Sequence, residues 1–144
     1  MSRLSKQFLR RQKRNRHLIT KRNYSNRLRI AVFKSNKGGS VQIIDDIKQA
    51  TLFSISYLMP EYVERLKEVS NKWSDYKVKW ENDYSLSLSD PKSYNMAGYL
   101  LLGEMVGEKC KEFNKKLVFD RGGWAYHGKL RCIAEAIRRS GGEI

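Results

Sequence analysis

LRIAVFKSNKGGSVQIIDD, residues 28–46, is the stretch that decides the fold. Apolar residues alternate with other residues in 28–34 and again in 40–45, and a period of two is typical of half-buried strands. The side chains expected on the buried face are Leu28, Ile30, Val32, Val41 and Ile43. Residues 35–39 contain Asn and Gly, which tolerate the positive φ angles of a tight turn. The stretch therefore predicts two antiparallel strands joined by a turn.

Further elements extend this pair into an α/β fold. Residues 51–56 predict a third strand, which completes an antiparallel meander. Residues 94–114 and 129–139 have the apolar spacing of helices. Three glycines predict a close approach of the first of these helices to the sheet: Gly98, Gly103 and Gly107. The apolar residues 117–119 predict a strand, and a strand after a long helix indicates parallel pairing. The expected fold class is α/β, with a mixed sheet packed against helices.

An apolar stripe runs through the centre of the chain. Its members recur at steps of three and four residues: Met59, Tyr62, Leu66, Val69, Trp73, Tyr76 and Trp80. This spacing predicts one long helix that begins near Pro60, since proline suits the first helical turn. Two interpretations stay open for its outer half. Either the helix packs on its own sheet, or Trp73, Tyr76 and Trp80 dock on a neighbouring protein, because two exposed tryptophans would form a costly apolar patch.

Charge divides the chain into a basic arm, residues 1–26, and one α/β domain, residues 27–144, with an extended helical insertion at about 57–93. Of the 29 Lys and Arg residues, 13 lie within residues 1–37, which contain no Asp or Glu. The remaining 16 stand against all 15 acidic residues. A block of like charge repels itself and cannot pack alone, so the arm requires a polyanion, of which nucleic acid is the most common.

Three other interpretations of the arm are a solvated tail, a mitochondrial presequence and a membrane-surface helix. Basic residues continue into the first strand, where a presequence would already have been cleaved. The arm also has few large apolar residues for a membrane surface, and no apolar run reaches the roughly 18 residues of a membrane span. Cys110 and Cys132 match no metal-binding spacing and are typical of reduced, partly buried thiols. We expect no metal, no cofactor and no membrane partner.

Two motifs are more specific than these patterns. VFKSNK at 32–37 is followed by QIIDD at 42–46, and VFDRGGWAYHGK occupies 118–129. Together they resemble the bacterial-type family of large-subunit ribosomal protein eighteen, over residues 5–56 and 94–144. The resemblance implies a ribonuclease-H-like α/β layout and a structural role in the large ribosomal subunit. It also implies contacts with 5S rRNA, with the large-subunit rRNA, and with ribosomal protein five and other proteins of the central protuberance.

Carried onto this sequence, the RNA-contacting positions of the family are the basic residues of the arm, the turn at 35–37 and the loop at 121–129. Guanidinium groups fork onto phosphate oxygens and lysines act as point charges; on a helix the arm's charges would lie all round the cylinder. The two glycines of the loop are expected to let the backbone approach a ligand, and Tyr126 and His127 to stack on a base or sugar. The predicted RNA-binding residues are Arg3, Lys6, Arg10, Arg11, Lys13, Arg14, Arg16, His17, Lys21, Arg22, Arg27, Arg29, Lys34, Ser35, Asn36, Lys37, Arg121, Gly122, Gly123, Tyr126, His127, Lys129 and Arg131.

The chain departs from the family pattern in two places. Bacterial members usually have His-Ile-Tyr-Ala where this chain has GGSV at 38–41, so we expect an aromatic stacking contact to be missing there. The stretch 57–93 is longer than the family norm. Extra length of this kind suggests an organellar ribosome, and we expect the mitochondrial matrix, with the bacterial cytoplasm as the alternative.

Other function classes make different demands on the residues. A nuclease would use Asp120 with His127, or Asp45 and Asp46 with Asp120, as metal ligands or an acid–base pair. No nucleophile–base–orienter set accompanies them, so we expect neither an enzyme nor a small-molecule substrate. Asp120 would otherwise cap its turn or pair with Arg121, and Tyr126 would lie partly in the core. A general DNA-compacting protein would use the arm alone and bind DNA and RNA similarly.

Overall fold

The computed structural model describes residues 4–22 and 26–144 of the chain. The secondary structure follows, in chain order, as α1 (Lys6–Lys21), β1 (Leu28–Lys34), β2 (Gly39–Asp45), β3 (Ala50–Ser56), α2 (Pro60–Asn71), α3 (Trp73–Tyr84), α4 (Met96–Cys110), β4 (Leu117–Asp120) and α5 (Lys129–Ser140). Arg3, one of the predicted RNA-binding residues, lies outside the described residues.

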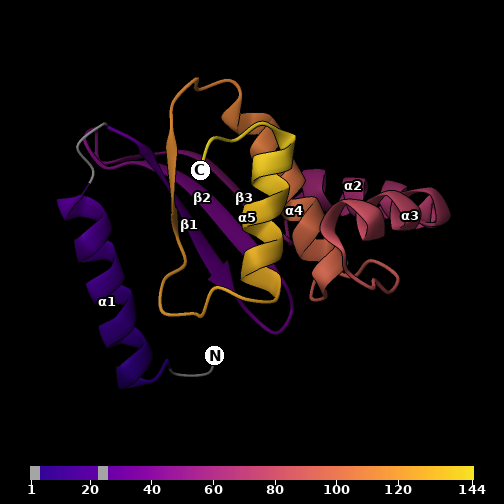
Figure 1. Cartoon of the computed structure of the whole chain (residues 1–144), viewed down its shortest axis with the longest axis horizontal. Coiled ribbons are helices and arrows are strands. Elements are labelled where there is room, and N and C mark those ends of the chain that lie inside the picture. The colour runs from indigo at the N-terminus through magenta and orange to yellow at the C-terminus, as the bar shows by residue number, and fades with distance from the viewer. Residues whose placement is uncertain (1–3, 23–25) are drawn as a thin grey trace.

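The strands form one sheet in the order β3-β2-β1-β4 (Figure 1). β1 pairs with β2, and β2 with β3, in antiparallel fashion, whereas β1 and β4 are parallel. α4 and α5 cover one face of the sheet, and α1 lies beside its β4 edge, at the opposite end of the molecule from α2 and α3. The predicted meander, the parallel strand and the α/β class with a mixed sheet are confirmed. No helix in the described ranges is long and apolar enough to cross a membrane.

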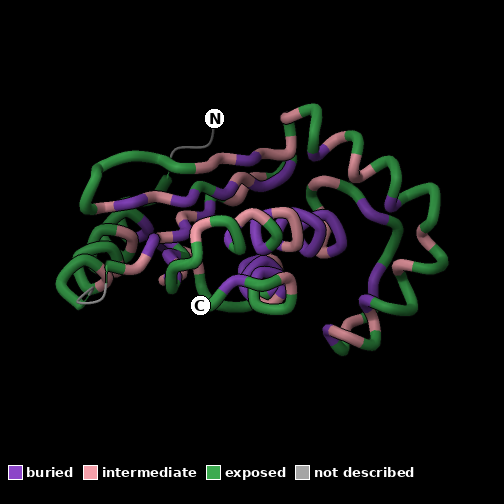
Figure 2. The backbone as a smooth tube through the Cα atoms, turned by 90° about the horizontal axis from the view of Figure 1, so that it is seen from above, coloured by how far each residue is buried: buried purple, intermediate pink, exposed green. Residues whose placement is uncertain are grey.

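The buried face of the sheet is the one that the alternating apolar residues predict. Ile30 pairs with Ile43 and Val32 with Val41 across the β1–β2 ladder, and all four side chains are buried. Figure 2 shows that the buried residues are concentrated on α4 and α5 and on the strands that these helices cover. Cys110 and Cys132 of this pair are buried free thiols, and burial raises the pKa of each to about 11. Both therefore stay protonated and unreactive at neutral pH.

The glycines of α4 serve a different contact from the one predicted. A Cβ atom on Gly103 would lie 2.7 Å from both the Ala136 Cβ atom and the Ile133 carbonyl oxygen of α5. A Cβ atom on Gly107 would lie 2.6 Å from the Ser140 Cβ atom. These two glycines therefore permit a close helix–helix approach between α4 and α5, and the prediction of a helix–sheet contact is corrected for them.

Gly103→Val is expected to lower the free energy of unfolding by about 3 kcal/mol. The valine side chain would clash with backbone atoms of Ile133 in α5, which cannot move aside as a flexible side chain can, so the two helices would be pushed apart. Urea unfolding followed by circular dichroism measures the change. Glu108→Val is the matched control: it places the same side chain on an exposed position of α4 and removes only a surface ion pair with Arg65. Equal stability of the two variants would contradict the close packing.

The apolar stripe forms two helices where one long helix was predicted. The break is at Lys72, whose φ of −110° and ψ of 30° lie outside the helical range. Because of this bend, α3 ends against α5: the Arg139 guanidinium lies 5.2 Å from the centre of the Tyr84 ring. Trp80 is completely buried in the core, so the prediction of Trp80 as an exposed docking residue is wrong. In one straight helix, the side chains of Trp80 and Tyr84 would point away from the core with the rest of the helix.

Trp73 and Tyr76 are half-buried around Trp80. Their rings meet the Trp80 ring edge-on, with centroid distances of 6.0 Å and 5.5 Å. They therefore extend the protein's own core outward, although the stripe meets α4 rather than the sheet that the first interpretation named. Docking of their exposed parts on a neighbouring protein stays a prediction.

Candidate nucleic-acid interface

The inner face of α1 packs against the rest of the protein, which we call the body (residues 26–144). Phe8 is buried and meets the Trp124 ring edge-on, with 4.6 Å between ring centroids. A Cβ atom on Gly123 would lie 2.6 Å from the Phe8 carbonyl oxygen, so glycine is needed for this approach. The predicted close approach of the backbone at Gly123 is real, but its partner is α1 rather than an external ligand.

Polar side chains on the same face of α1 bind the glycine loop, residues 121–128. The Arg11 Nε atom donates a hydrogen bond to the Gly123 carbonyl oxygen at 3.1 Å. The Asn15 Nδ2 atom donates to the Gly122 carbonyl oxygen at 2.7 Å. Arg11 thus has a partner within the protein, and the prediction that charges are presented all round the helix is corrected.

Asp120, at the end of β4, is the centre of an ion-pair network. Its side chain is 0% exposed, and its Oδ2 atom accepts hydrogen bonds from Arg16 Nε at 3.1 Å and from Arg29 Nη1 at 2.9 Å. Arg29 also binds both carboxylate oxygens of Asp46, at distances from 3.0 to 3.3 Å. Because Arg16 belongs to α1 and Arg29 to β1, the network ties the arm to the sheet.

The network stabilises the charged form of the Arg29 guanidinium. Burial is the largest single influence on this guanidinium and lowers its pKa, but hydrogen bonds and charges from Asp46 and Asp120 outweigh burial and raise the pKa overall. The Arg29 side chain is only 15% exposed. The prediction of Arg29 as an RNA-binding cation is therefore corrected, because its guanidinium is already bound to two carboxylates.

The aspartates considered for a nuclease have structural partners instead. Asp46 and Asp120 do come together, but around Arg29. Asp120 also accepts a hydrogen bond from the Gly122 amide at 2.8 Å, so it caps its turn as one alternative predicted. Its charged partners are Arg16 and Arg29 and not Arg121. In the described part of the chain, no group of three His, Cys, Asp or Glu residues is arranged to hold a metal ion.

The outer face of α1 is cationic and points to solvent. Ser5 caps the helix, since its Oγ atom accepts a hydrogen bond from the Phe8 amide at 3.1 Å. No acidic residue occurs in the helix. The exposed basic and histidine side chains of this outer face are Lys6, Arg10, Lys13, Arg14, His17 and Lys21. The spacing of these residues by three and four positions forms one continuous charged strip.

Phe33 and Trp124 bring the predicted contact regions together, and sequence analysis missed both. Phe33, near the end of β1, is 52% exposed, and its ring lies 5.8 Å from the Trp124 ring. Trp124 also contacts Phe8, so α1, the glycine loop and the end of β1 meet at one indole ring. The signal for Phe33 was available, because it is out of phase with the buried Leu28, Ile30 and Val32.

The turn after β1 is held by hydrogen bonds from the amide and the hydroxyl of Ser35 to the Gly38 carbonyl oxygen. The Ser35 Oγ atom donates to the Gly38 carbonyl oxygen at 2.7 Å, which leaves Asn36 and Lys37 exposed. A Cβ atom on Gly38 would lie 2.4 Å from the Tyr57 ring. Gly38 therefore makes room for Tyr57, an aromatic residue that follows β3.

The predicted RNA-binding residues of the glycine loop and α5 differ in their exposure and in whether they already have a partner within the protein. Lys129 lies with its Nζ atom 5.5 Å from the centre of the Tyr99 ring, and Arg131 binds Glu135 at 2.8 Å on the exposed surface. Among the other predicted residues, those exposed are Arg22, Arg121, Tyr126 and His127, and those half-buried are Arg27 and Lys34. The free cations and rings thus gather on α1 and the glycine loop.

By fold and surface, the chain is a small α/β protein that presents a one-faced cationic helix beside its sheet. The model of the family described as "Ribosomal L18 of archaea, bacteria, mitoch. and chloroplast" matches residues 2–79 and 84–144. The large ribosomal subunit protein uL18 of Bartonella henselae is 30% identical over 138 residues, which are 95% of each chain. That of Petrotoga mobilis is 32% identical over 133 residues, 90% of this chain and 89% of the relative. That of Pelotomaculum thermopropionicum is 34% identical over 136 residues, 93% and 92% of the two chains.

The chain therefore belongs to the L18 family of ribosomal proteins. The resemblance drawn from the two sequence motifs is confirmed. The family is one of ribosomal proteins rather than enzymes, which agrees with the function class expected from the sequence.

Proposed function

We propose that this chain is a structural component of the large ribosomal subunit that binds 5S rRNA. In the proposed role it helps to attach 5S rRNA to the large-subunit rRNA in the central protuberance, beside ribosomal protein five. The names of its relatives support the large subunit. The 5S rRNA and the neighbouring protein are the finer part of the proposal and rest on the family resemblance of the arm, the turn at 35–37 and the glycine loop.

The observation that carries the proposal is the division of α1 into two faces. The inner face holds the helix in place, through Phe8, Asn15 and the Arg16–Asp120 ion pair. The outer face offers cations without any acidic neighbour on the helix. A fixed cationic strip meets phosphates without first paying the conformational entropy of ordering a loose arm. This arrangement suits a folded RNA of definite shape better than an arbitrary polyanion.

The type of ribosome stays a prediction. The relatives described above are bacterial, and the family description includes mitochondria and chloroplasts beside bacteria. The mitochondrial location suggested by the length of residues 57–93 would be supported if the tagged chain sedimented with mitochondrial large subunits. Sedimentation with bacterial subunits would support the alternative.

Replacing Arg10, Lys13 and Arg14 together by Gln is expected to weaken binding to 5S rRNA about a hundredfold in 0.15 M salt. Each lost phosphate contact lowers the log–log dependence of affinity on salt by about 0.7 to 0.9, so three contacts lower it by about 2 to 3. Fluorescence titration of labelled 5S rRNA over a series of salt concentrations measures both quantities. The three side chains are exposed and form no hydrogen bond or ion pair with the described part of the body, so stability should change little.

The matched control replaces Lys67, Lys72 and Lys77 by Gln, which removes the same charge from exposed positions of α2, α3 and the residue between them. This control should keep the affinity and salt dependence of the wild type. Equal losses in the two triple variants would mean that net charge alone governs binding. Duplex DNA of equal length serves as competitor, and equal affinity for DNA and 5S rRNA would favour a general compacting protein.

A further inference from the structure

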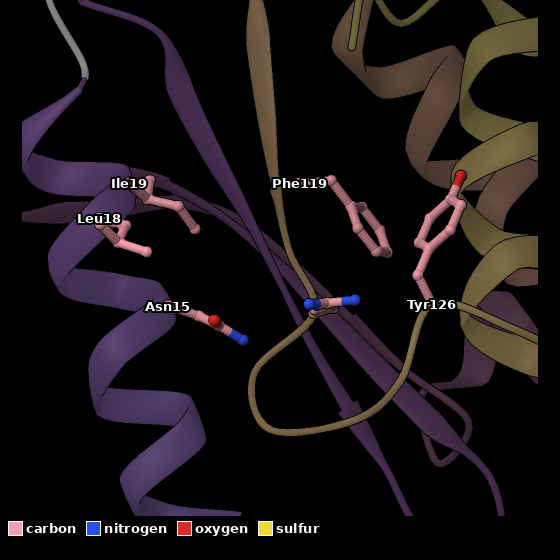
Figure 3. Close-up of a pocket in the computed structure, with 6 residues that line it drawn as sticks. Asn15, Leu18, Ile19, Phe119 and Tyr126 are labelled. Atoms are coloured by element: carbon pink, nitrogen blue, oxygen red, sulfur yellow. The ribbon is translucent and has the colours of Figure 1, made fainter.

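A pocket of about 370 Å³ lies between α1 and the body, beside the contacts that hold the helix in place. Its walls are mainly apolar: Leu18 and Ile19 from α1, and Phe119 and Tyr126 from β4 and the glycine loop. Figure 3 shows Leu18 and Ile19 on one side of this pocket, facing Phe119 and Tyr126 on the other. Ligand pockets in proteins run from about 300 to 1,000 Å³, so this one has room for a single small group.

The apolar walls are unusual for their surroundings. Leu18 and Tyr126 are each 38% exposed. Exposed apolar side chains contribute nothing to phosphate binding by the neighbouring cations, so their exposure calls for another explanation. Leu18 is followed within one helical turn by Lys21 and Arg22. Arg121 is part of the pocket lining. The pocket is therefore an apolar hollow with Arg121 in its lining and with Lys21 and Arg22 three and four residues beyond Leu18, and we call these three cations its cationic mouth.

Tyr126 is fixed in position before any ligand arrives. Its ring meets Phe119 edge-on, with 6.2 Å between ring centroids and 79° between planes. Its hydroxyl oxygen accepts a hydrogen bond from Arg138 Nη1 at 3.0 Å. A T-shaped contact covers at most one of the two faces of the tyrosine ring, which leaves a face for stacking. A ring held in this way loses little entropy when a planar group stacks on it.

Asn15 adds a polar group to the same wall. Its Nδ2 atom donates to the Gly122 carbonyl oxygen at 2.7 Å, which fixes the orientation of the amide. The amide still has its carbonyl oxygen and a second N–H for a ligand, and this pair of acceptor and donor matches the hydrogen-bonding edge of a nucleobase. The Tyr126 ring, the Asn15 amide and the Arg121 guanidinium thus lie around the same pocket.

We infer that this pocket takes one unstacked base of the bound RNA, with the base against Tyr126 and the phosphates of its strand on Arg121, Lys21 and Arg22. The inference rests on the proposed function, since it names a subsite for the same RNA. An apolar side chain of a neighbouring protein is the competing occupant. The cationic mouth favours the nucleotide, because single-stranded nucleic acid is bound by stacking platforms within positively charged grooves.

The test compares two single changes on α1. Leu18→Trp fills the pocket from its helical wall, whereas Leu9→Trp places the same ring on an exposed leucine that does not line it. In titrations with 5S rRNA, Leu18→Trp should bind about tenfold weaker than Leu9→Trp, roughly the worth of one base–aromatic stack. The salt dependence should stay close to that of Leu9→Trp, because Arg121, Lys21 and Arg22 all remain available to the phosphates. Tyr126→Leu, which keeps an apolar wall but removes the stacking face, should weaken binding to a similar degree.

The outcomes distinguish failure of the base-binding pocket from failure of the proposed 5S rRNA binding. If the wild type binds 5S rRNA tightly and Leu18→Trp and Tyr126→Leu bind as well as Leu9→Trp, the pocket holds no base. If those two variants lose affinity for assembled large subunits but not for naked 5S rRNA, the occupant is a protein side chain and the inference is overturned. If the wild type itself fails to bind 5S rRNA, the proposed function falls and the pocket inference with it.

Discussion

Asp120→Ala is expected to lower the free energy of unfolding by about 3–5 kcal/mol and to release α1 from the body. The carboxylate is 0% exposed and binds two arginines, so its loss leaves the nearly buried Arg29 with Asp46 alone and removes the carboxylate that Arg16 binds. It also removes the acceptor of the Gly122 amide. Urea unfolding measures the first effect. Limited trypsin digestion measures the second, because the freed helix exposes many Lys and Arg sites.

Two further variants separate the parts of this network. Arg16→Ala removes a partner that is 47% exposed, and exposed ion pairs contribute about 1 kcal/mol or less. Arg16→Ala should therefore loosen α1 with little change in the stability of the body. Asp120→Asn keeps the size of the side chain and the acceptor for the Gly122 amide, so it should fall between the other two. An Asp120→Ala protein as stable and as resistant to trypsin as the wild type would show that the network does not hold the arm.

The sheet could be predicted because its information is local. Within each strand the residues of the buried face recur every two positions, as Leu28, Ile30 and Val32 do, so a strand and its buried face follow from neighbouring residues alone. The parallel strand followed in the same way from a short apolar run after a helix. Both predictions are confirmed by the register, in which Ile30 lies opposite Ile43 and Phe119 on the two sides of β1.

The position of the arm could not be predicted in the same way. Arg16 and Asp120 are separated by 104 residues, and nothing in the spacing of either one names the other. Part of the signal was nevertheless present in α1. Phe8, Asn15 and Ile19 are uncharged and recur at helical spacing, while most of the charged residues, although not Arg11 and Arg16, occupy the other face. Charge counts treat both faces alike, which is why Arg11 was expected to be free.

The helical stripe shows the opposite failure, in which a regular pattern predicted too regular a structure. Heptad-like spacing from Met59 to Trp80 fits one straight helix, and no proline or glycine marks the bend at Lys72. The bend becomes favourable only through tertiary contacts that bury Trp80 and Tyr84 near α5. Burial of large aromatic side chains outweighs the loss of one or two backbone hydrogen bonds within a helix.

Trp80→Ala is therefore expected to destabilise the protein by about 3–5 kcal/mol, the usual range for a fully buried tryptophan. For a chain of 144 residues this corresponds to a drop in Tm of about 10 to 17 °C. Trp73→Ala removes a half-buried ring and should cost about 1 kcal/mol. Thermal unfolding followed by circular dichroism compares the two variants without relying on tryptophan fluorescence.

Trp80→Phe separates packing from hydrogen bonding at the same position. Burial raises the pKa of Glu104 and the nearby Trp80 indole N–H opposes that rise, but among the described residues this N–H has no hydrogen-bond partner of normal geometry. Phe keeps an aromatic ring against Trp73 and Tyr76, so it should recover more than half of the stability that Ala loses. If Trp80→Ala instead unfolded like the wild type while failing to join the large subunit, Trp80 would be a docking residue after all. The burial of its side chain makes the loss of stability the expected result, because a ring without solvent contact cannot be reached by a neighbour unless α3 first leaves the core.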